Sequence, residues 1–256
     1  MREGPLLWSD PKNWNGSTEA APHLEQLPCR QDDAVLPETK HTLSILMPMK
    51  EIRVKSIRMS DHKHPFTQWQ WEDFQDQREF ARGRFTVKYS EYNCEKCPCQ
   101  DDLYGDYLQE ICAIQKPRCG FTACEYPLKV EGHCCRYCGG RVSLSEKASL
   151  PIVKITVNDA LQEYEEKITW HVRQTWGGKA EVLIKRKGEY SNADVEDAID
   201  SVKAALLNTG IEVLSTESAG AALQDNRLAF ALGPLFGTPL VIFAFLLLGF
   251  AYFGYS

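Results

Sequence analysis

Nine of the ten cysteines in this chain of 256 residues lie within residues 94–138, and this crowding constrains the fold more than any other feature. The block begins with the pattern C-x-x-C-x-C and ends with C-C-x-x-C. So little apolar sequence lies between the cysteines that disulfides must replace a hydrophobic core, by restricting the unfolded chain. Cysteines at this density are typical of an oxidising compartment. We therefore predict a small disulfide-rich domain outside the cytosol.

The predicted disulfide cysteines are Cys29, Cys94, Cys97, Cys99, Cys112, Cys119, Cys124, Cys134, Cys135 and Cys138. Adjacent Cys134 and Cys135 are hard to join to each other, so we expect each to pair elsewhere. The odd number in the block leaves one thiol to reach Cys29 or a partner chain. Zinc is the alternative, because Cys94/Cys97 and His133/Cys134/Cys138 have ligand-like spacing. The oxidising compartment disfavours zinc, and no metal or cofactor is predicted.

The last 29 residues, from Leu228 to Ser256, carry no charged side chain. About 20 apolar residues suffice for a helix to cross a bilayer, so a transmembrane helix is predicted over residues 228–254. A buried core helix is one alternative. A lipid-anchor signal, with its attachment site among Ser218, Ala219 and Gly220, is another. The sequon at Asn15 predicts glycosylation and agrees with exposure outside the cytosol.

Residues 1–93 read as a β-rich region that is punctuated by prolines. Residues 42–47, 52–59 and 84–89 are β-prone, and residues 68–74 alternate aromatic with polar side chains, as a strand would. This alternation favours core packing over a ligand platform. An all-β region is expected, built as a sandwich or a β-solenoid.

Residues 140–217 predict a small α+β domain next to the membrane. We expect helices over residues 159–176 and from Ser191 onward, with Ser191 and Asp194 as a capping pair and Gly210 as the stop. Strands are expected over residues 152–157, 180–185 and 211–214, giving a small sheet with helices on one face. Residues 218–227 are expected to form a polar stalk. The predicted domains are therefore 1–93, 94–139 and 140–217, followed by the stalk and the membrane helix.

Charge and motifs narrow the function classes. The formal net charge of −6 argues against a general nucleic-acid binder, which needs a basic face. The chain contains no nucleophile elbow, P-loop, dinucleotide fingerprint or His-Glu-x-x-His motif, so no enzyme is predicted. Asp32 and Asp33 beside Cys29 could bind calcium or take part in acid–base chemistry. An exposed turn is the preferred interpretation of these residues. His62 and His64 are read as solvated loop histidines rather than as a pH sensor.

Two family resemblances follow from these motifs. The cysteine pattern resembles the second half of a von Willebrand factor type C module. The chain as a whole resembles the amnionless family through Trp8-x-Asp10-Pro11-x-x-Trp14, Leu27-Pro28-Cys29-Arg30-x-Asp32-Asp33, Pro37, Arg53-Val54-x-Ser56-Ile57 and the block from Cys94 to Gly139. These motifs occur in collinear order over nearly the whole chain. The apolar segment occupies the position expected for the membrane helix of that family.

The amnionless resemblance implies a single-pass type I membrane protein that binds cubilin, with one chain holding a cubilin trimer. It implies apical delivery of cubilin and endocytosis of intrinsic factor–cobalamin and of filtered proteins such as albumin, with residence at the apical plasma membrane and in endosomes. It also implies a β-helix-like form for residues 1–93.

The sequence departs from the family pattern at both ends, where we expect a signal peptide, a first ectodomain portion and a cytoplasmic tail to be missing. Endocytic adaptors are therefore not expected partners. The alternative is a membrane-tethered regulator of bone morphogenetic proteins, since type C modules capture such growth factors.

Overall fold

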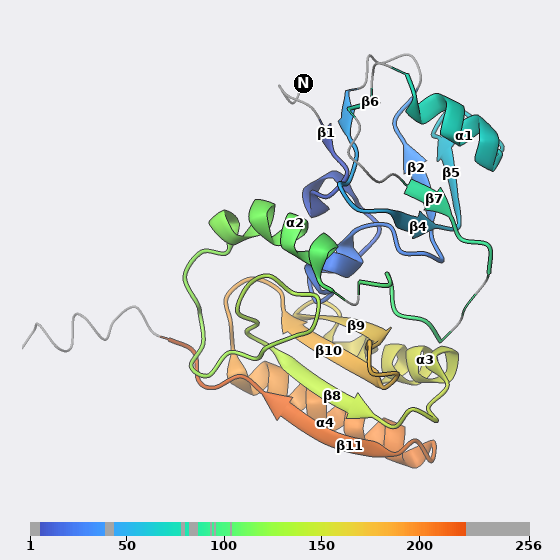
Figure 1. The fold of residues 1–256 in the computed structure, drawn as a ribbon. Helices are drawn as coiled ribbons and strands as arrows, with labels where there is room; N and C mark the ends of the chain where they lie inside the picture. Colours follow the sequence, from blue (N-terminus) through green and yellow to red (C-terminus); the bar gives the residue numbers. More distant parts are fainter. Residues whose placement is uncertain are drawn as a thin grey trace, which may run out of the picture. The chain divides into compact units, whose positions relative to one another are not determined.

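The computed structural model describes residues 6–38, 44–77, 80–81, 87–92, 94, 96–102 and 104–223 (Figure 1). The chain divides into two compact units, Met1–Ala221 and Ala222–Ser256. The first unit mixes small sheets and helices around a disulfide-rich segment. The predicted membrane segment, residues 228–254, lies outside the described residues. Within the described part, no helix is long and apolar enough to span a bilayer.

The N-terminal region consists of short strands that pair only in parallel. These are β1 (Leu6–Leu7), β2 (Asp33–Leu36), β3 (Ile45–Leu46), β4 (Ile52–Val54), β5 (Ser56–Met59), β6 (Phe80–Ala81) and β7 (Val87–Tyr89). They form three small sheets with the orders β1-β3-β6, β2-β5 and β4-β7. Successive passes of the chain therefore stack in register, but the described strands do not close into a solenoid. Two 3-10 helices, η1 (Pro11–Asn13) and η2 (His23–Gln26), lie between β1 and β2.

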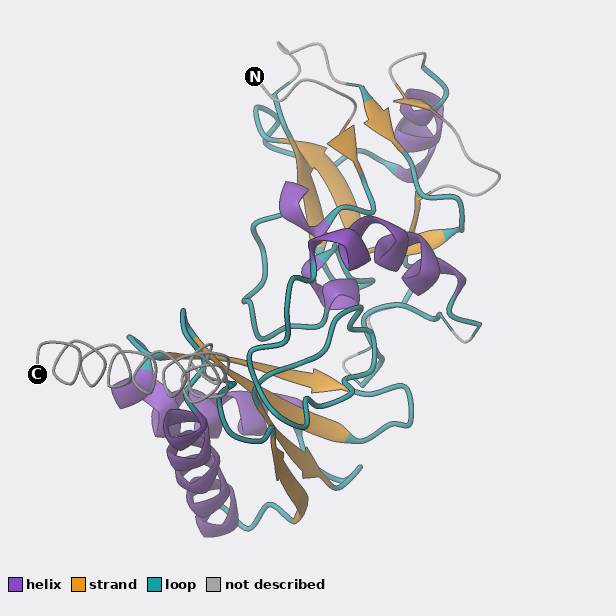
Figure 2. Ribbon diagram, turned by 90° about the vertical axis from the view of Figure 1, so that its left-hand side faces the viewer, coloured by secondary structure: helices purple, strands orange, loops and turns teal. Residues whose placement is uncertain are grey.

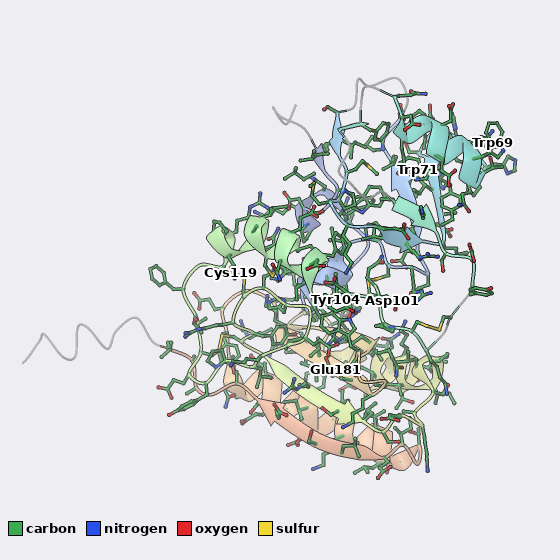
Figure 3. All side chains as sticks on the ribbon, in the orientation of Figure 1. Trp69, Trp71, Asp101, Tyr104, Cys119 and Glu181 are labelled. Carbon is green, nitrogen blue, oxygen red and sulfur yellow. A yellow bond between two sulfur atoms is a disulfide. The ribbon has the colours of Figure 1, made fainter. Side chains whose placement is uncertain are left out.

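The expectation that this region is all β is wrong at residues 68–74, because they belong to helix α1 (Gln68–Gln75). A capping box begins the helix: Gln70 donates its N–H to the Thr67 side chain, and the Gln70 side chain accepts from the Thr67 N–H at 2.9 Å. Trp71 is fully buried and donates from Nε1 to the Val87 carbonyl at 2.8 Å. Trp69 lies on the opposite side and is 68% exposed (Figure 3). The alternating aromatics thus belong to a helix with one tryptophan in the core.

The cysteine block contains helix α2 (Asp106–Gln115) and the 3-10 helix η3 (Lys116–Arg118). Tyr107 and Ile111 of α2 are buried in the same core as the β-rich region. Asp102 accepts the backbone N–H groups of Tyr107 and Leu108, at 3.1 and 2.8 Å, and so holds the first turn of the helix. The block therefore packs onto the β-rich region as part of one hydrophobic core.

Residues 140–218 form an antiparallel four-stranded sheet with the order β11-β8-β10-β9 (Figure 2). The strands are β8 (Gly140–Leu144), β9 (Ile168–Gln174), β10 (Ala180–Arg186) and β11 (Val213–Ser218). Helices α3 (Leu150–Leu161) and α4 (Asn192–Asn208) contact each other and share one hydrophobic core with the sheet. The 3-10 helix η4 (Gln162–Tyr164) follows α3. This is the predicted small sheet with helices on one face.

Helix α4 confirms the sequence prediction in detail. Ser191 is its N-cap and accepts the Asp194 N–H, and Gly210 follows its end with a φ of 74°. That left-handed conformation favours glycine and ends the helix. The predicted apolar face is buried throughout, comprising Val195, Ala198, Ile199, Val202 and Leu206.

The preceding segment is predicted wrongly, because helix and strand are exchanged. Residues 152–157, expected as a strand, lie in α3, whose first turn contains Pro151. Residues 168–174, expected as the end of a helix, form β9. Consecutive side chains are buried at both ends of β9, because one face of the strand packs against the helices and the other against η2. Burial therefore does not alternate along the strand with a period of two. The first residues of the expected stalk are hydrogen-bonded: Ala219 donates to the Gly139 carbonyl at 2.9 Å, and the Ala221 carbonyl accepts from Glu125 at 2.8 Å.

Candidate binding cleft of the β-rich region

A cleft of about 630 Å³ lies in the β-rich region, lined by residues 13–17, 25–28 and 32–35. Its three segments contain several of the N-terminal residues that the sequence singled out, including Trp14, the predicted glycosylation site Asn15 and the acidic pair Asp32-Asp33. The volume lies within the range of protein binding pockets. The cleft is therefore the candidate site, and its walls are described in turn.

The first wall is fixed by two tryptophans. Trp8 is buried, and Trp14 donates from Nε1 to the Trp8 carbonyl at 2.9 Å with the rings edge to face at 4.9 Å. Asp10 caps η1 by accepting the Lys12 N–H at 3.1 Å and binds Arg118 at 2.8 Å. Burial alone would raise the pKa of Asp10, but the hydrogen bond from Arg118 and its charge lower it. Asn15 follows on the exposed rim of the cleft.

The second wall is the turn from Cys29 to Asp33. Asp32 accepts the Cys29 N–H through Oδ2 at 2.9 Å, and the Asp32 N–H donates to the Cys29 carbonyl at 2.9 Å. Asp33 accepts from the Ser56 hydroxyl at 2.5 Å and binds Lys55 at 3.2 Å. The Ser56 hydrogen bond and then the Lys55 charge lower the pKa of Asp33. Both carboxylates are therefore engaged in holding the turn, as the exposed-turn interpretation requires.

Strand β2 supplies the apolar part of the cleft. Its side chains alternate, with Ala34 and Leu36 buried and Val35 40% exposed. Leu27 is buried behind the floor. An exposed β-branched side chain at the edge of a cleft offers a partner apolar surface without requiring the region to unfold.

Five disulfides join all ten cysteines, and one of them reaches the turn that forms the second wall of the cleft. The pairs are Cys29–Cys99, Cys94–Cys97, Cys112–Cys134, Cys119–Cys135 and Cys124–Cys138. Cys29 was one of the two predicted partners for the odd thiol of the block. It pairs with Cys99 across 70 residues and joins the cleft turn to the cysteine block. The adjacent Cys134 and Cys135 pair with different elements, as predicted. Cys134 is bonded to Cys112 in α2, and Cys135 is bonded to Cys119 at the end of η3.

Glu25, which lines the cleft, belongs to a buried ionic cluster. Glu25 of η2 accepts from Arg173 of β9 at 2.6 Å and lies 2.7 Å from His171 Nε2, while Arg173 Nε donates to Glu181 of β10 at 2.6 Å. The three charged side chains of Glu25, Arg173 and Glu181 are each less than 10% exposed. Burial opposes ionisation of Glu25, but the His171 hydrogen bond and the Arg173 charge lower its pKa. No local sequence pattern marks this cluster, because Glu25 and Arg173 lie 148 residues apart.

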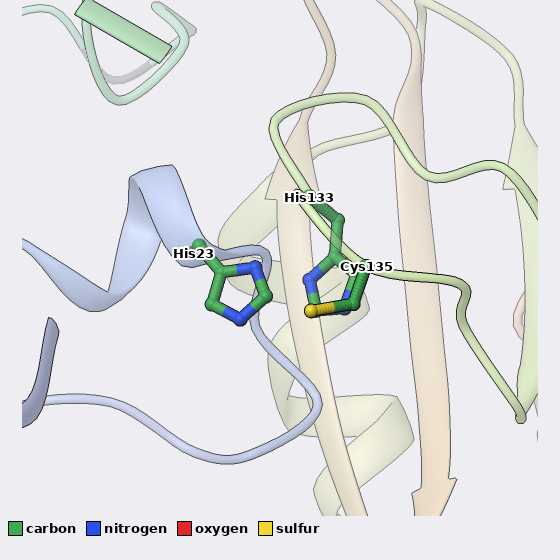
Figure 4. A group of neighbouring side chains, drawn as sticks. All are labelled: His23, His133 and Cys135. Atoms are coloured by element: carbon green, nitrogen blue, oxygen red, sulfur yellow. The ribbon is translucent and has the colours of Figure 1, made fainter. Parts of the chain in front are cut away.

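The four described histidines outside the ionic cluster divide into two groups. His62 and His64 are exposed, as expected for solvated loops. His23 and His133 instead stack at 4.0 Å beside Cys135, and this trio is the one set of three clustered metal-type donors among the described residues (Figure 4). Cys135 is bonded to Cys119, and Cys134 and Cys138 of the zinc alternative are also in disulfides. A thiolate-based zinc site is therefore incompatible with this disulfide pattern.

Comparison with known proteins places the whole chain in one group. The sequence model of the family described as Amnionless matches residues 1–256. Protein amnionless of Sus scrofa is 31% identical over 154 residues, which cover 55% of this chain and 29% of the pig protein. The matched part is thus less than a third of that relative's length.

Proposed function

Because this chain belongs to the Amnionless family, we propose that it is a non-enzymatic membrane protein that binds cubilin and anchors it. One chain holds a cubilin trimer and supports its apical delivery for receptor-mediated endocytosis of intrinsic factor–cobalamin and of filtered proteins such as albumin. The observation that carries the proposal is the cleft, because the motif residues Trp14, Leu27-Pro28 and Asp32-Asp33 line it together.

The build of the cleft supports a role in protein binding. The Cys29–Cys99 disulfide, the Trp8–Trp14 pair and the Glu25–Arg173 ion pair fix its walls before any partner arrives. A preformed site loses less conformational entropy on binding than a flexible one. Exposed Val35 and the acidic turn give it an apolar wall beside a polar one, which is the usual anatomy of a protein interface.

The remaining regions complete the proposed anchor. Residues 1–93 form a β-rich contact region, residues 94–139 the disulfide-rich module and residues 140–217 the membrane-proximal domain. Residues 218–227 lead to a membrane helix over residues 228–254, with the ectodomain outside the cell. The parallel strand pairs and the disulfides support this arrangement.

Co-precipitation with the N-terminal region of cubilin tests the proposal, with the chain expressed behind an added signal peptide. Val35→Glu places a charge in the cleft, while the matched variant Leu214→Glu changes a side chain that is 47% exposed on β11, outside it. We expect Val35→Glu to lower the cubilin affinity by about tenfold or more, since an unpaired charge is costly in an interface. Leu214→Glu should bind like the unaltered chain.

Equal binding by both variants would place the contact elsewhere. Capture of a small growth-factor dimer instead of cubilin would support the growth-factor regulator and contradict the anchor proposal.

A further inference from the structure

A second cavity, of about 320 Å³, adjoins the cleft at Trp14 and Gln26. His23 of η2, His133, Lys185 of β10, Arg118 of η3 and Arg136 line it, and Glu19 is its one acidic lining residue. Neither the cleft nor the ionic cluster uses this cavity. Its cluster of basic side chains and histidines therefore needs a separate explanation.

The positive charge of the cavity is only partly neutralised. Arg118 binds Asp10 at 2.8 Å. Lys185 is half-buried and Arg136 is exposed, and neither has an ion-pair partner among residues 6–38, 44–77, 80–81, 87–92, 94, 96–102 and 104–223. This concentration of cations stands in a chain whose formal net charge is −6. Burying an ammonium group without a partner is costly, so an anion here would lower the free energy of the folded state.

The two imidazoles add directional groups to this charge. His23 Nδ1 accepts the Cys134 N–H at 3.0 Å, so the neutral His23 ring carries its proton on Nε2 as a donor. His133 Nδ1 is buried and has no hydrogen-bond partner within the described structure. The rings lie nearly parallel, at 17°, with their centroids 4.0 Å apart (Figure 4). A buried polar atom without a partner points to a group that is still to be bound.

We propose that this cavity binds a small oxyanion, the chemistry shared by sulfate, phosphate and carboxylate groups, between Lys185, Arg118, Arg136 and the His23–His133 pair. Arginine and lysine supply the charge-assisted hydrogen bonds that oxyanions need. The same cations repel a metal ion, and the Cys119–Cys135 disulfide removes the thiolates that a metal would use.

Linkage predicts how pH changes the binding. Burial and the Lys185 charge lower the pKa of His23 to about 4, and burial, His23, Lys185 and Arg173 lower that of His133 to about 3. The other charged groups facing the pair are Arg118, Arg136 and Glu19. A bound anion opposes the cations and raises both imidazole pKa values. Anion affinity must therefore rise as the pH falls, because binding and protonation favour each other.

Isothermal titration of the full chain in detergent micelles tests the site with three probes: sodium sulfate, sodium phosphate and sodium acetate, at constant ionic strength in chloride. We expect saturable binding of at least one probe at pH 7. Sulfate keeps its charge between pH 7 and pH 5, so it reports the linkage, and its affinity should increase at pH 5. Differences among the probes separate tetrahedral anions from carboxylates.

Lys185→Met should weaken binding by about tenfold or more, the loss of one charge-assisted hydrogen bond. The matched variant is Lys203→Met, an exposed lysine on α4. Circular dichroism verifies that both variants fold, and Arg136→Gln, at an exposed position, repeats the test should Lys185→Met unfold. The proposal is overturned if no probe binds saturably, or if Lys203→Met weakens binding as much as the two cavity variants.

Discussion

Replacing Arg173 by methionine tests whether the buried ionic cluster holds the β-rich region against the sheet. The guanidinium lies 2.6 Å from both Glu25 and Glu181 and is 4% exposed. Arg173→Met preserves much of the side-chain volume but leaves two buried carboxylates without their cation. The pKa of Glu25 should rise, because burial then acts unopposed by the Arg173 charge.

The magnitude follows from the burial of the cluster. Removing one partner of a buried ion pair costs about 3–5 kcal/mol of unfolding free energy. For a unit of about 220 residues, each kcal/mol lowers Tm by about 2–4 °C, so the expected fall is about 6–20 °C. The assay is thermal unfolding at pH 7, followed by circular dichroism without reductant.

Two controls make the result specific. Arg186→Met removes an ion pair with Asp194 in which both side chains are 26% exposed, and it should cost about 1 kcal/mol or less. Adding Glu25→Gln and Glu181→Gln to Arg173→Met should recover part of the loss, since no unpaired charge then stays buried. A fall in Tm for Arg173→Met no larger than that for Arg186→Met would show that the buried cluster does not stabilise the fold.

Three further variants probe the rest of the fold. In the folded state the pKa values of His23 and His133 lie below the ordinary value of 6.5. Their contribution to stability is therefore complete above pH 6.5 and declines as the pH falls towards about 4. His133→Gln should flatten the decline in Tm between pH 6.5 and pH 5, and an unchanged slope contradicts this. Gly139→Ala places a Cβ 2.3 Å from the Ile184 carbonyl oxygen and should cost about 1–3 kcal/mol in denaturant unfolding, whereas Gly16→Ala, with no atom within 4 Å, should be neutral. Cys135→Ser leaves Cys119 unpaired and should cause retention in the endoplasmic reticulum, since losing a bridge costs about 2–5 kcal/mol; normal surface delivery would argue against that bridge being required.

Local signals in the sequence predicted α4 well and α1 badly. In α4 the cap Ser191, the apolar face and Gly210 all agree, so local preference and tertiary packing favour one structure. In residues 68–74 the aromatics alternate as in a strand, but the cap at Thr67 with Gln70 is a helix signal and decides the outcome. A cap at a segment's start is therefore the stronger indicator where a short apolar pattern suits both structures.

The exchange of α3 and β9 has a tertiary cause. Spacings of three and four between Leu161 and Val172 imitate a helix face, yet β9 is covered on both faces and has no reason to alternate. The Ser149 N-cap and Pro151 in the first turn were the local signals that marked α3.

The cleft residues were predictable as a group of motifs, but their convergence was not. Pairing of Cys29 with Cys99 and of Glu25 with Arg173 joins segments 70 and 148 residues apart, which no local pattern specifies. The stacked His23–His133 pair was missed for the same reason, since the two rings come from η2 and the cysteine block.

Surface biotinylation of cubilin, expressed with and without this chain, tests the anchor role most directly. The chain carries an added signal peptide, and the N-terminal region of cubilin is co-expressed in epithelial cells. We expect cubilin to reach the surface only when the chain is present, and we expect Val35→Glu to reduce this delivery while Leu214→Glu does not. Surface delivery of the chain without cubilin would contradict it.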